Sequence, residues 1–321
     1  MTTSDAGSSV TARPDDPNRP PVATPTTTTP PVSALSRAAK DAHKGLTSPW
    51  ASLFAVVLAF LWTLPTFGLL ITSIRPQRDI NTSGWWTFFT NPNFTLENYE
   101  TVVATSGSAG LGTAFINSIV ITIPAVLIPI TLALLAAYAF AWVDFKGRSF
   151  LFVCVFALQI VPIQVTMIPL LSLYVDAGFR NSFWPVWISH SIFALPLAIF
   201  LLHNFMREIP RELLEAARVD GAGHVQILFK VLMPLLTPAL AAFGIFQFLW
   251  VWNDLLVALV FGSSPQIQPI TAAIANLAGT QGTAWHLLSA GAFFSIAVPL
   301  IVFLSLQRFF VRGLLAGGLK G

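Results

Sequence analysis

Long apolar runs recur along this chain and are separated by short polar stretches. Six runs are long enough to cross a membrane, because a helix needs about 20 residues to span the hydrocarbon core. We place them at residues 50–74, 113–142, 150–174, 183–202, 235–261 and 287–306. None shows the alternation of a barrel strand, and backbone groups in lipid must be satisfied within the segment. The pattern therefore predicts an all-α, polytopic membrane protein with six transmembrane helices.

The first 49 residues differ in composition from the rest. Residues 1–31 contain eight threonines and seven prolines, and no aromatic residue precedes Trp50. Such a segment cannot bury enough apolar surface to offset the entropy of ordering it. It also lacks the basic start and the short apolar stretch of a signal peptide. We expect a disordered cytoplasmic tail over residues 1–49 and a six-span domain over residues 50–321.

The overall composition agrees with a membrane location. Charged residues make up 10% of the chain and apolar residues 55%, whereas a soluble domain carries about 25% charge. A soluble globular enzyme is therefore excluded, because its surface would be too apolar for water. The single cysteine, Cys154, cannot form an internal disulfide or a cysteine-rich metal site. The basic residues are scattered between apolar runs, which argues against a nucleic-acid partner.

The distribution of basic residues predicts the orientation. Lys and Arg are enriched on the cytoplasmic side of membrane proteins. Placing both termini in the cytoplasm puts 14 basic residues inside and leaves only Arg75, Arg78 and Arg180 outside. We therefore expect a multi-pass protein with both termini in the cytoplasm.

The longest cytoplasmic loop, residues 203–234, is unusually organised for a connector. Pro210 suits the first turn of a helix, and Gly221 can supply the left-handed residue that stops it. The spacing predicts a helix of about ten residues. A second short helix is expected to begin near His224 and to lead into Pro234.

Helix physics alone leaves two interpretations of this loop open. In the first, it is a solvated connector in which Glu215 pairs with Arg211 and Arg218 at helical spacing. In the second, it is a docking surface. Ala216 and Ala217 keep one face thin, so that another protein can approach the backbone closely.

A longer motif in this loop decides between the two interpretations. Its residues are Glu215-Ala216-Ala217, Gly221 after three further residues, and then Val231, Met233 and Pro234. They closely resemble the EAA signature of permease subunits of bacterial ABC importers, whose consensus has Ile and Leu in place of Val231 and Met233. In that family the loop forms a coupling helix that docks in a cleft of a separate ATPase. The resemblance assigns that role to Glu215, Ala216, Ala217, Asp220 and Gly221.

The resemblance also implies a fold and a set of partners. It implies the type I permease fold of ABC importers, in the inner membrane of a bacterial cell. The partners implied are a second homologous permease subunit, two ATPase subunits, an extracytoplasmic sugar-binding protein and membrane lipid. Consistently, the chain contains no Gly-Lys-Ser/Thr phosphate loop, so a partner must supply the energy.

Three further stretches place the resemblance in the carbohydrate branch, nearest to the maltose-type second permease. They are residues 94–99 (FTLENY), residues 250–254 (WVWND) and the tail over residues 308–321. Residues 84–86 (GWW) and 247–254 are similar to the alpha-glucoside subgroup. The resemblance thus implies import of an oligosaccharide, an alpha-glucoside such as maltose or trehalose.

Asp254 is the only acidic residue that we place well inside a span, where a charge costs roughly 3 kcal/mol unless it faces protein or water. In one interpretation, Asp254 and Asn253 line the sugar path or a gate, and Trp250 or Trp252 offers an apolar face to a pyranose ring. In the other, Asp254 caps a helix break or pairs with another span.

Catalytic chemistry has no candidate in this sequence. The five histidines form no His-Glu-x-x-His pattern, and no Gly-x-Ser-x-Gly elbow occurs. We therefore predict no catalytic residue, no metal and no cofactor, and a chain that is not itself an enzyme. The rival function is a stand-alone secondary transporter for a small polar solute. That class usually shows two related halves and paired intramembrane charges, and Asp254 has no obvious charged partner in the sequence.

Overall fold

The computed structural model describes residues 49–104, 110–280 and 284–318. Of the predicted tail, only Pro49 falls among these residues, so the disorder predicted for residues 1–49 lies outside the described part. The chain forms two compact units, residues 1–63 and 64–321. The described part of the first unit is the N-terminal part of one long helix.

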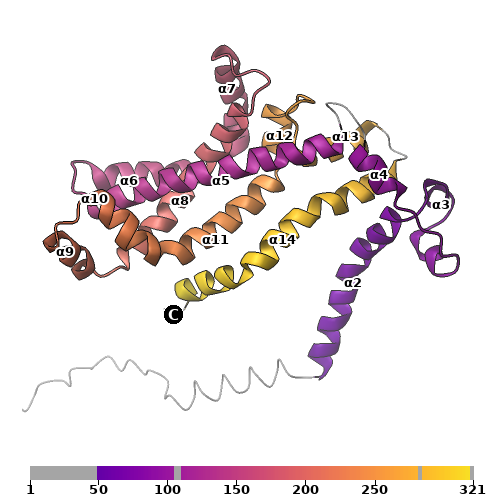
Figure 1. The fold of residues 1–321 in the computed structure, drawn as a ribbon, viewed down its shortest axis with the longest axis horizontal. Coiled ribbons are helices and arrows are strands. Elements are labelled where there is room, and N and C mark those ends of the chain that lie inside the picture. The colour runs from indigo at the N-terminus through magenta and orange to yellow at the C-terminus, as the bar shows by residue number, and fades with distance from the viewer. Residues whose placement is uncertain (1–48, 105–109, 281–283, 319–321) are drawn as a thin grey trace, which may run out of the picture. The chain divides into compact units, whose positions relative to one another are not determined.

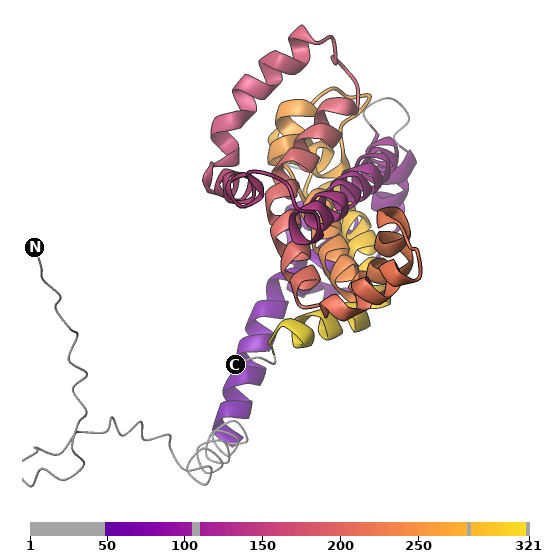
Figure 2. The ribbon, with the colours of Figure 1, turned by 90° about the vertical axis from the view of Figure 1, so that its left-hand side faces the viewer.

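All regular structure in the described residues is helical, which confirms the all-α prediction (Figures 1 and 2). The long helices are α2 (Pro49–Ser73), α5 (Leu111–Trp142), α8 (Trp184–Arg207), α11 (Met233–Trp252) and α14 (Trp285–Gly318). The shorter helices are α3 (Gln77–Thr82), α4 (Glu97–Ala104), α6 (Arg148–Ala157), α7 (Ile163–Asp176), α9 (Arg211–Val219), α10 (His224–Gln226), α12 (Leu256–Phe261) and α13 (Ile270–Thr280). Two 3₁₀ turns, η1 (Trp85–Phe89) and η2 (Leu158–Ile160), and a π-helical segment (Ile227–Leu232) complete them.

Among the described residues, five helices are long and apolar enough to cross a membrane, or six if one bent pair counts as a span. Four of them, α2, α5, α8 and α14, lie over predicted runs. The fifth is the stretch His224–Trp252, which begins earlier than the predicted run and includes α11. The predicted polytopic architecture is confirmed.

The third predicted span, residues 150–174, is not one continuous helix. α6 and η2 end before Val161, and α7 begins after Pro162 at an angle of 100° to them. A proline disfavours the helical conformation of the residue before it, and Val161 is extended. A kink is the sequence expectation at Pro162, and the structure has a bend of 100° there, so the pair is either a broken span or a re-entrant loop.

The fifth predicted span, residues 235–261, is also interrupted. α11 ends at Trp252, and α12 begins at Leu256. Asn253 donates from Nδ2 to the carbonyl of Leu249 at 2.8 Å, while Asp254 accepts from the backbone N–H of Ala258. Short polar side chains that bond the nearby backbone compete with the helix, which explains the break.

Three prolines inside long helices leave carbonyls without a helical partner, and side chains of neighbouring helices supply the missing donors. A proline has no N–H, so the carbonyl four residues earlier receives no helical hydrogen bond. The three contacts are Trp187 Nε1 to the carbonyl of Val120 (Pro124), Gln247 Nε2 to that of Ala125 (Pro129) and Trp252 Nε1 to that of Ser295 (Pro299), at 3.1, 3.2 and 3.2 Å. These contacts fix the axial positions of α8, α11 and α14 relative to one another and to α5.

Small residues line the contact between α5 and α8. Ala133, Ala137 and Ala141 recur every four residues on α5 and are buried, and Ala194 and Ala198 of α8 belong to the same apolar cluster. Small side chains let two helix backbones approach closely in lipid. α5 therefore serves as the central helix against which α8 and α11 pack.

The second unit has two differently built ends. The turn between α5 and α6 lies near α9 and α10, and α4 and α13 pack near the start of α5 (Figure 1). By the predicted orientation, the α9 end is cytoplasmic and the α13 end is external.

The proline contacts predict a thermodynamic coupling. Trp252→Phe should lower the stability of the purified protein by about 1 kcal/mol more in the native background than in a Pro299→Ala background, because alanine restores the helical donor to Ser295. Thermal unfolding of the two single variants and the double variant measures this difference. Equal effects of Trp252→Phe in both backgrounds would show that the indole N–H contributes nothing at this carbonyl.

Candidate functional site

The predicted loop helix exists and ends as expected. α9 follows Pro210, which is the residue before the helix rather than part of its first turn. Gly221 has a φ of +80°, its N–H donates to the carbonyl of Arg218, and the N–H of Ala222 donates to that of Ala217, both at 2.9 Å. This pair of bonds is the Schellman arrangement, which needs a left-handed residue at the glycine position. The helix end is thus specified by sequence.

α9 is anchored to the spans through Leu214 and Ala217. Leu214 is 2% exposed and belongs to the apolar cluster formed by α5, α8 and α11. Ala217 and Ala222 pack against the same cluster from the side. The hydroxyl of Tyr138, on α5, and Nδ1 of His224 hydrogen-bond at 2.6 Å and fix the start of the next helix.

The other predicted coupling residues face outward. Glu215, Ala216, Asp220 and Gly221 are exposed, and Ala217 is half-buried. Within the described part of the chain, Glu215 makes no ion pair with Arg211 or Arg218. The solvated-connector interpretation expected those pairs. Their absence leaves the charges of this face available to another molecule.

The second short helix leads into a span through an irregular turn. α10 passes into the π-helical segment Ile227–Leu232, and α11 then starts with Pro234 in its first turn. Leu228 and Leu232 are buried in the same cluster as Leu214. The loop is therefore continuous with α11, both in the chain and in packing.

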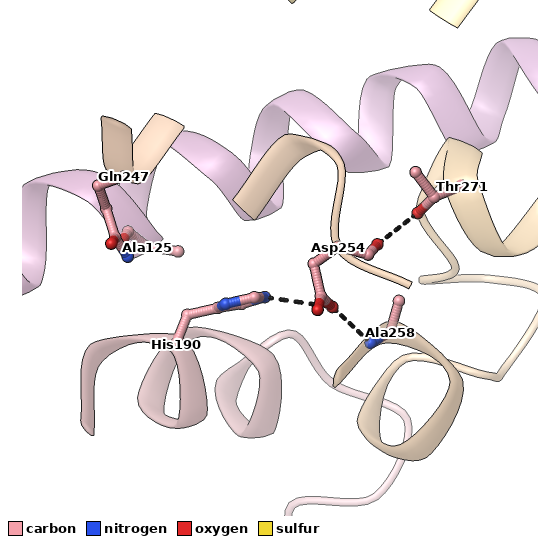
Figure 3. Close-up of polar contacts among 6 residues, drawn as sticks. All are labelled: Ala125, His190, Gln247, Asp254, Ala258 and Thr271. Carbon is pink, nitrogen blue, oxygen red and sulfur yellow. Dashed lines mark hydrogen bonds and ion pairs between the residues drawn. The ribbon is translucent and has the colours of Figure 1, made fainter. Parts of the chain in front are cut away.

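Asp254 lies between α11 and α12 and contacts three other elements (Figure 3). Its Oδ2 accepts from the N–H of Ala258 at 3.1 Å, so the side chain caps the first turn of α12. Its backbone carbonyl accepts from Oγ1 of Thr271, on α13, at 2.7 Å. Nε2 of His190, on α8, lies 3.8 Å from Oδ2. Asp254 thus combines the helix cap and the contact with another span that the structural interpretation named.

Sequence reasoning missed His190. It is 1% exposed, 64 positions from Asp254 in the chain, and no local pattern marks it. Its ring stands edge-on to that of Trp250, with centroids 6.1 Å apart. The histidine therefore links the Asp254 cap to the tryptophan predicted for the substrate path.

The four predicted path residues have different environments. Trp252 is 1% exposed, packs against Phe115 and uses its indole N–H on the carbonyl of Ser295. Asn253 bonds its own helix, as described above. Trp250 is half-buried and lines a cavity.

That cavity has a volume of about 550 Å³ and lies where α6 and α7 bend beside α8 and α11. Its lining includes Gln159, Gln164, Gln247 and Trp250, and contains no charged side chain. Gln247 is fully buried, and its Oε1 has no hydrogen-bond partner among the described residues. A cavity of this size, with an aromatic face and several amides, suits a neutral molecule that carries hydroxyl groups.

Comparison with known proteins identifies the family. The model for "Binding-protein-dependent transport system inner membrane component" matches residues 129–315. The osmoprotective compounds uptake permease protein GgtD of Synechocystis sp. is 50% identical over 270 residues, which cover 83% of this chain and 90% of that protein. The alpha-glucoside transport system permease protein AglG of Rhizobium meliloti is 38% identical, with 85% and 97% covered. The melibiose/raffinose/stachyose import permease protein MelC of Bacillus subtilis is 33% identical, with 84% and 96% covered.

A solved structure agrees on the fold. A chain from the crystal structure of a bacterial ABC transporter involved in the import of the acidic polysaccharide alginate superimposes with a TM-score of 0.64 at 23% sequence identity. The match covers 82% of this chain and 98% of that chain. Transport systems of this family combine a periplasmic binding protein, an ATPase and permease subunits in the inner membrane. The choice between importer subunit and stand-alone transporter is thereby settled: this chain belongs to the binding-protein-dependent transport system inner membrane components, as a non-catalytic, multi-pass permease subunit of an ABC importer.

Proposed function

We propose that this chain pairs with a second homologous permease and two ATPase subunits to import a neutral oligosaccharide, an alpha-glucoside such as maltose or trehalose. The relatives' names support a solute of this class, because they specify osmoprotective compounds, alpha-glucosides and melibiose-type sugars. A cavity without charged side chains fits a neutral solute better than an acidic solute. In this proposal residues 50–321 form the permease domain, and both termini face the cytoplasm.

The coupling helix of the proposal is α9, within the loop 203–234. On α9, Glu215 and Ala216 are exposed and Ala217 borders the anchored side, while Asp220 and Gly221 are exposed directly after its end. Its position at one end of the second unit, with unpaired charges, supports docking in a cleft of the ATPase.

One observation carries the proposal. The apolar cluster that buries Leu214 of α9 also contains Ala194 of α8 and Phe243 of α11, and both of these residues line the cavity. Packed side chains transmit a displacement because interiors are dense and resist compression. A movement of α9 driven by the ATPase therefore reaches the cavity walls through one continuous core.

This continuity supports alternating access. When the ATPase subunits close on ATP, α9 is pushed, and α8 and α11 shift with it because they share its core. The chain forms no bond with the solute. Its contribution is the difference in packing between an outward-open and an inward-open state.

Trp250 and Gln247 are the proposed substrate contacts on this chain. Trp250 offers an aromatic face to a sugar ring, and the free Oε1 of Gln247 can accept from a hydroxyl group. Asn253 and Asp254 act through position, since the cap on α12 and the contact with His190 hold the region beside Trp250.

Mild purification of the protein should yield a complex with an ATPase. ATP hydrolysis by that complex should rise several-fold when its binding protein carries maltose or trehalose and should not rise with an acidic sugar such as glucuronate, because the cavity has no basic group to neutralise a carboxylate. Stimulation by glucuronate alone would refute the neutral substrate and leave the importer function intact.

Glu215→Lys should reduce sugar uptake by about tenfold or more without removing the chain from the membrane, because reversing a charge at an interface costs several kcal/mol. Uptake, membrane abundance and co-purification of the ATPase are the measurements. Glu208→Lys makes the same charge change on an exposed residue outside α9 and should leave uptake near normal. Full uptake by Glu215→Lys would refute the coupling role.

Trp250→Ala should slow uptake about fivefold, because an aromatic contact is worth roughly 1 kcal/mol and the cavity loses its flat face. Trp250→Phe should retain most of the rate. Trp184→Ala, on α8 outside the cavity lining, is the control and should transport normally. If Trp250→Ala and Trp184→Ala behave alike, Trp250 does not contact the solute.

A further inference from the structure

The connection between α2 and α5 contains an uncharged, aromatic segment. Residues 84–96 include Trp85, Trp86, Phe88, Phe89 and Phe94 and have no acidic or basic side chain. η1 forms the first part of this segment, and we call residues 84–89 the aromatic segment. Its composition is that of a membrane interface more than of a soluble loop.

The polar side of this connection is held by one arginine. Arg75 is 4% exposed, and its guanidinium donates to the carbonyl of Gly84 at 2.9 Å and to the hydroxyls of Ser83 and Thr87 at 2.7 and 3.1 Å. The amide of Asn98 donates to the carbonyl of Arg75 at 2.8 Å. These bonds bind the aromatic segment to the end of α2.

The apolar side folds back along α2. The ring of Phe67 lies 6.0 Å from that of Trp85 and 6.3 Å from that of Phe89. A Cβ on Gly68 would approach the Trp85 indole to 2.8 Å, so the glycine allows this close contact. Phe67 precedes the end of α2 at Ser73 by six residues, which is about 9 Å along a helix axis. The aromatic segment thus lies beside an apolar part of the span, below its end.

Two large apolar side chains of the aromatic segment are exposed. Trp86 and Phe89 are each 64% exposed, although Phe89 is stacked on Phe67. On α2, Phe67 and Leu70 are 38% and 39% exposed. The exposed face of the aromatic segment is therefore continuous with the exposed apolar face of α2.

We propose that the aromatic segment is an interfacial anchor that inserts Trp86 and Phe89 into the outer leaflet, at the boundary between lipid headgroups and acyl chains. Three observations favour lipid over a protein partner. The segment packs beside Phe67, before the end of α2; its exposed face is continuous with the apolar face of α2; and residues 84–96 carry no charge. Amphipathic aromatic rings are stable at that boundary. Arg75 places the anchor at a fixed height on α2.

Nitroxide accessibility tests this anchor in the intact complex. Cys154 is the only cysteine, so a Cys154→Ser background allows single labels at Trp86→Cys and Phe89→Cys. Asn81→Cys, exposed on α3 of the same connection, is the matched control. The labelled complexes are placed in phosphatidylcholine nanodiscs, and ATP hydrolysis confirms that each variant has assembled.

At each label we compare the ratio of collisions with oxygen to collisions with a water-soluble nickel chelate. This ratio should be at least about threefold higher at positions 86 and 89 than at position 81, because oxygen concentrates in lipid and the chelate does not. A ratio at both positions equal to that at 81 would place the segment in water. Protection from both reagents would mean that another subunit covers it, and either result overturns the proposal. If one variant fails to assemble, the other position decides.

Discussion

A proline within a lipid-embedded helix leaves one backbone carbonyl without its helical hydrogen bond, and the bilayer core holds no water to replace that bond. This constraint organises the spans of the second unit. Trp187, Gln247 and Trp252 each place a side-chain N–H on such a carbonyl of a different helix. A hydrogen bond to one particular carbonyl is directional, whereas apolar packing permits sliding. These contacts therefore set the register in which α5, α8, α11 and α14 meet, and the alanine-lined contact between α5 and α8 then forms at that register.

The register determines what lies at each level of the bundle. At one end it packs Leu214 of α9 into the cluster with α5 and α11, and toward the α13 end it brings His190 within 3.8 Å of Asp254. The same contact that fixes Gln247 by its amide nitrogen leaves its Oε1 without a hydrogen-bond partner, in a residue that lines the cavity. In the proposed function, a residue used for helix registration is therefore also a substrate contact.

Run length in the sequence predicted the spans because hydrophobicity over about 20 residues is a local property. It could not give the size of the bend at Pro162, where the chain turns by 100°, while Pro124, Pro129, Pro196 and Pro299 remain inside helices. At three of these four prolines, a side chain of another helix donates to the carbonyl that the proline leaves open, and no local pattern contains that donor. Likewise, the stop of α9 at Gly221 was predictable from one residue, whereas the contact of His190 with Asp254 joins positions in different helices. Trp250 and Trp252 have similar sequence surroundings, and only the packing shows that Trp250 is half-buried and lines the cavity while Trp252 is buried.

Two helix interruptions without a cross-helix donor lie at the cavity. The bend after Val161 forms part of its wall, and so do Ile192 and Pro196 of α8, where the proline removes the helical partner of the Ile192 carbonyl. No side chain among the described residues donates to that carbonyl, in contrast to those of Val120, Ala125 and Ser295. A helix is held in one conformation where its gap is filled from outside and deforms more readily where it is not. In the proposed alternating access, we therefore expect α5 to move least and the cavity walls formed by α7 and α8 to move most.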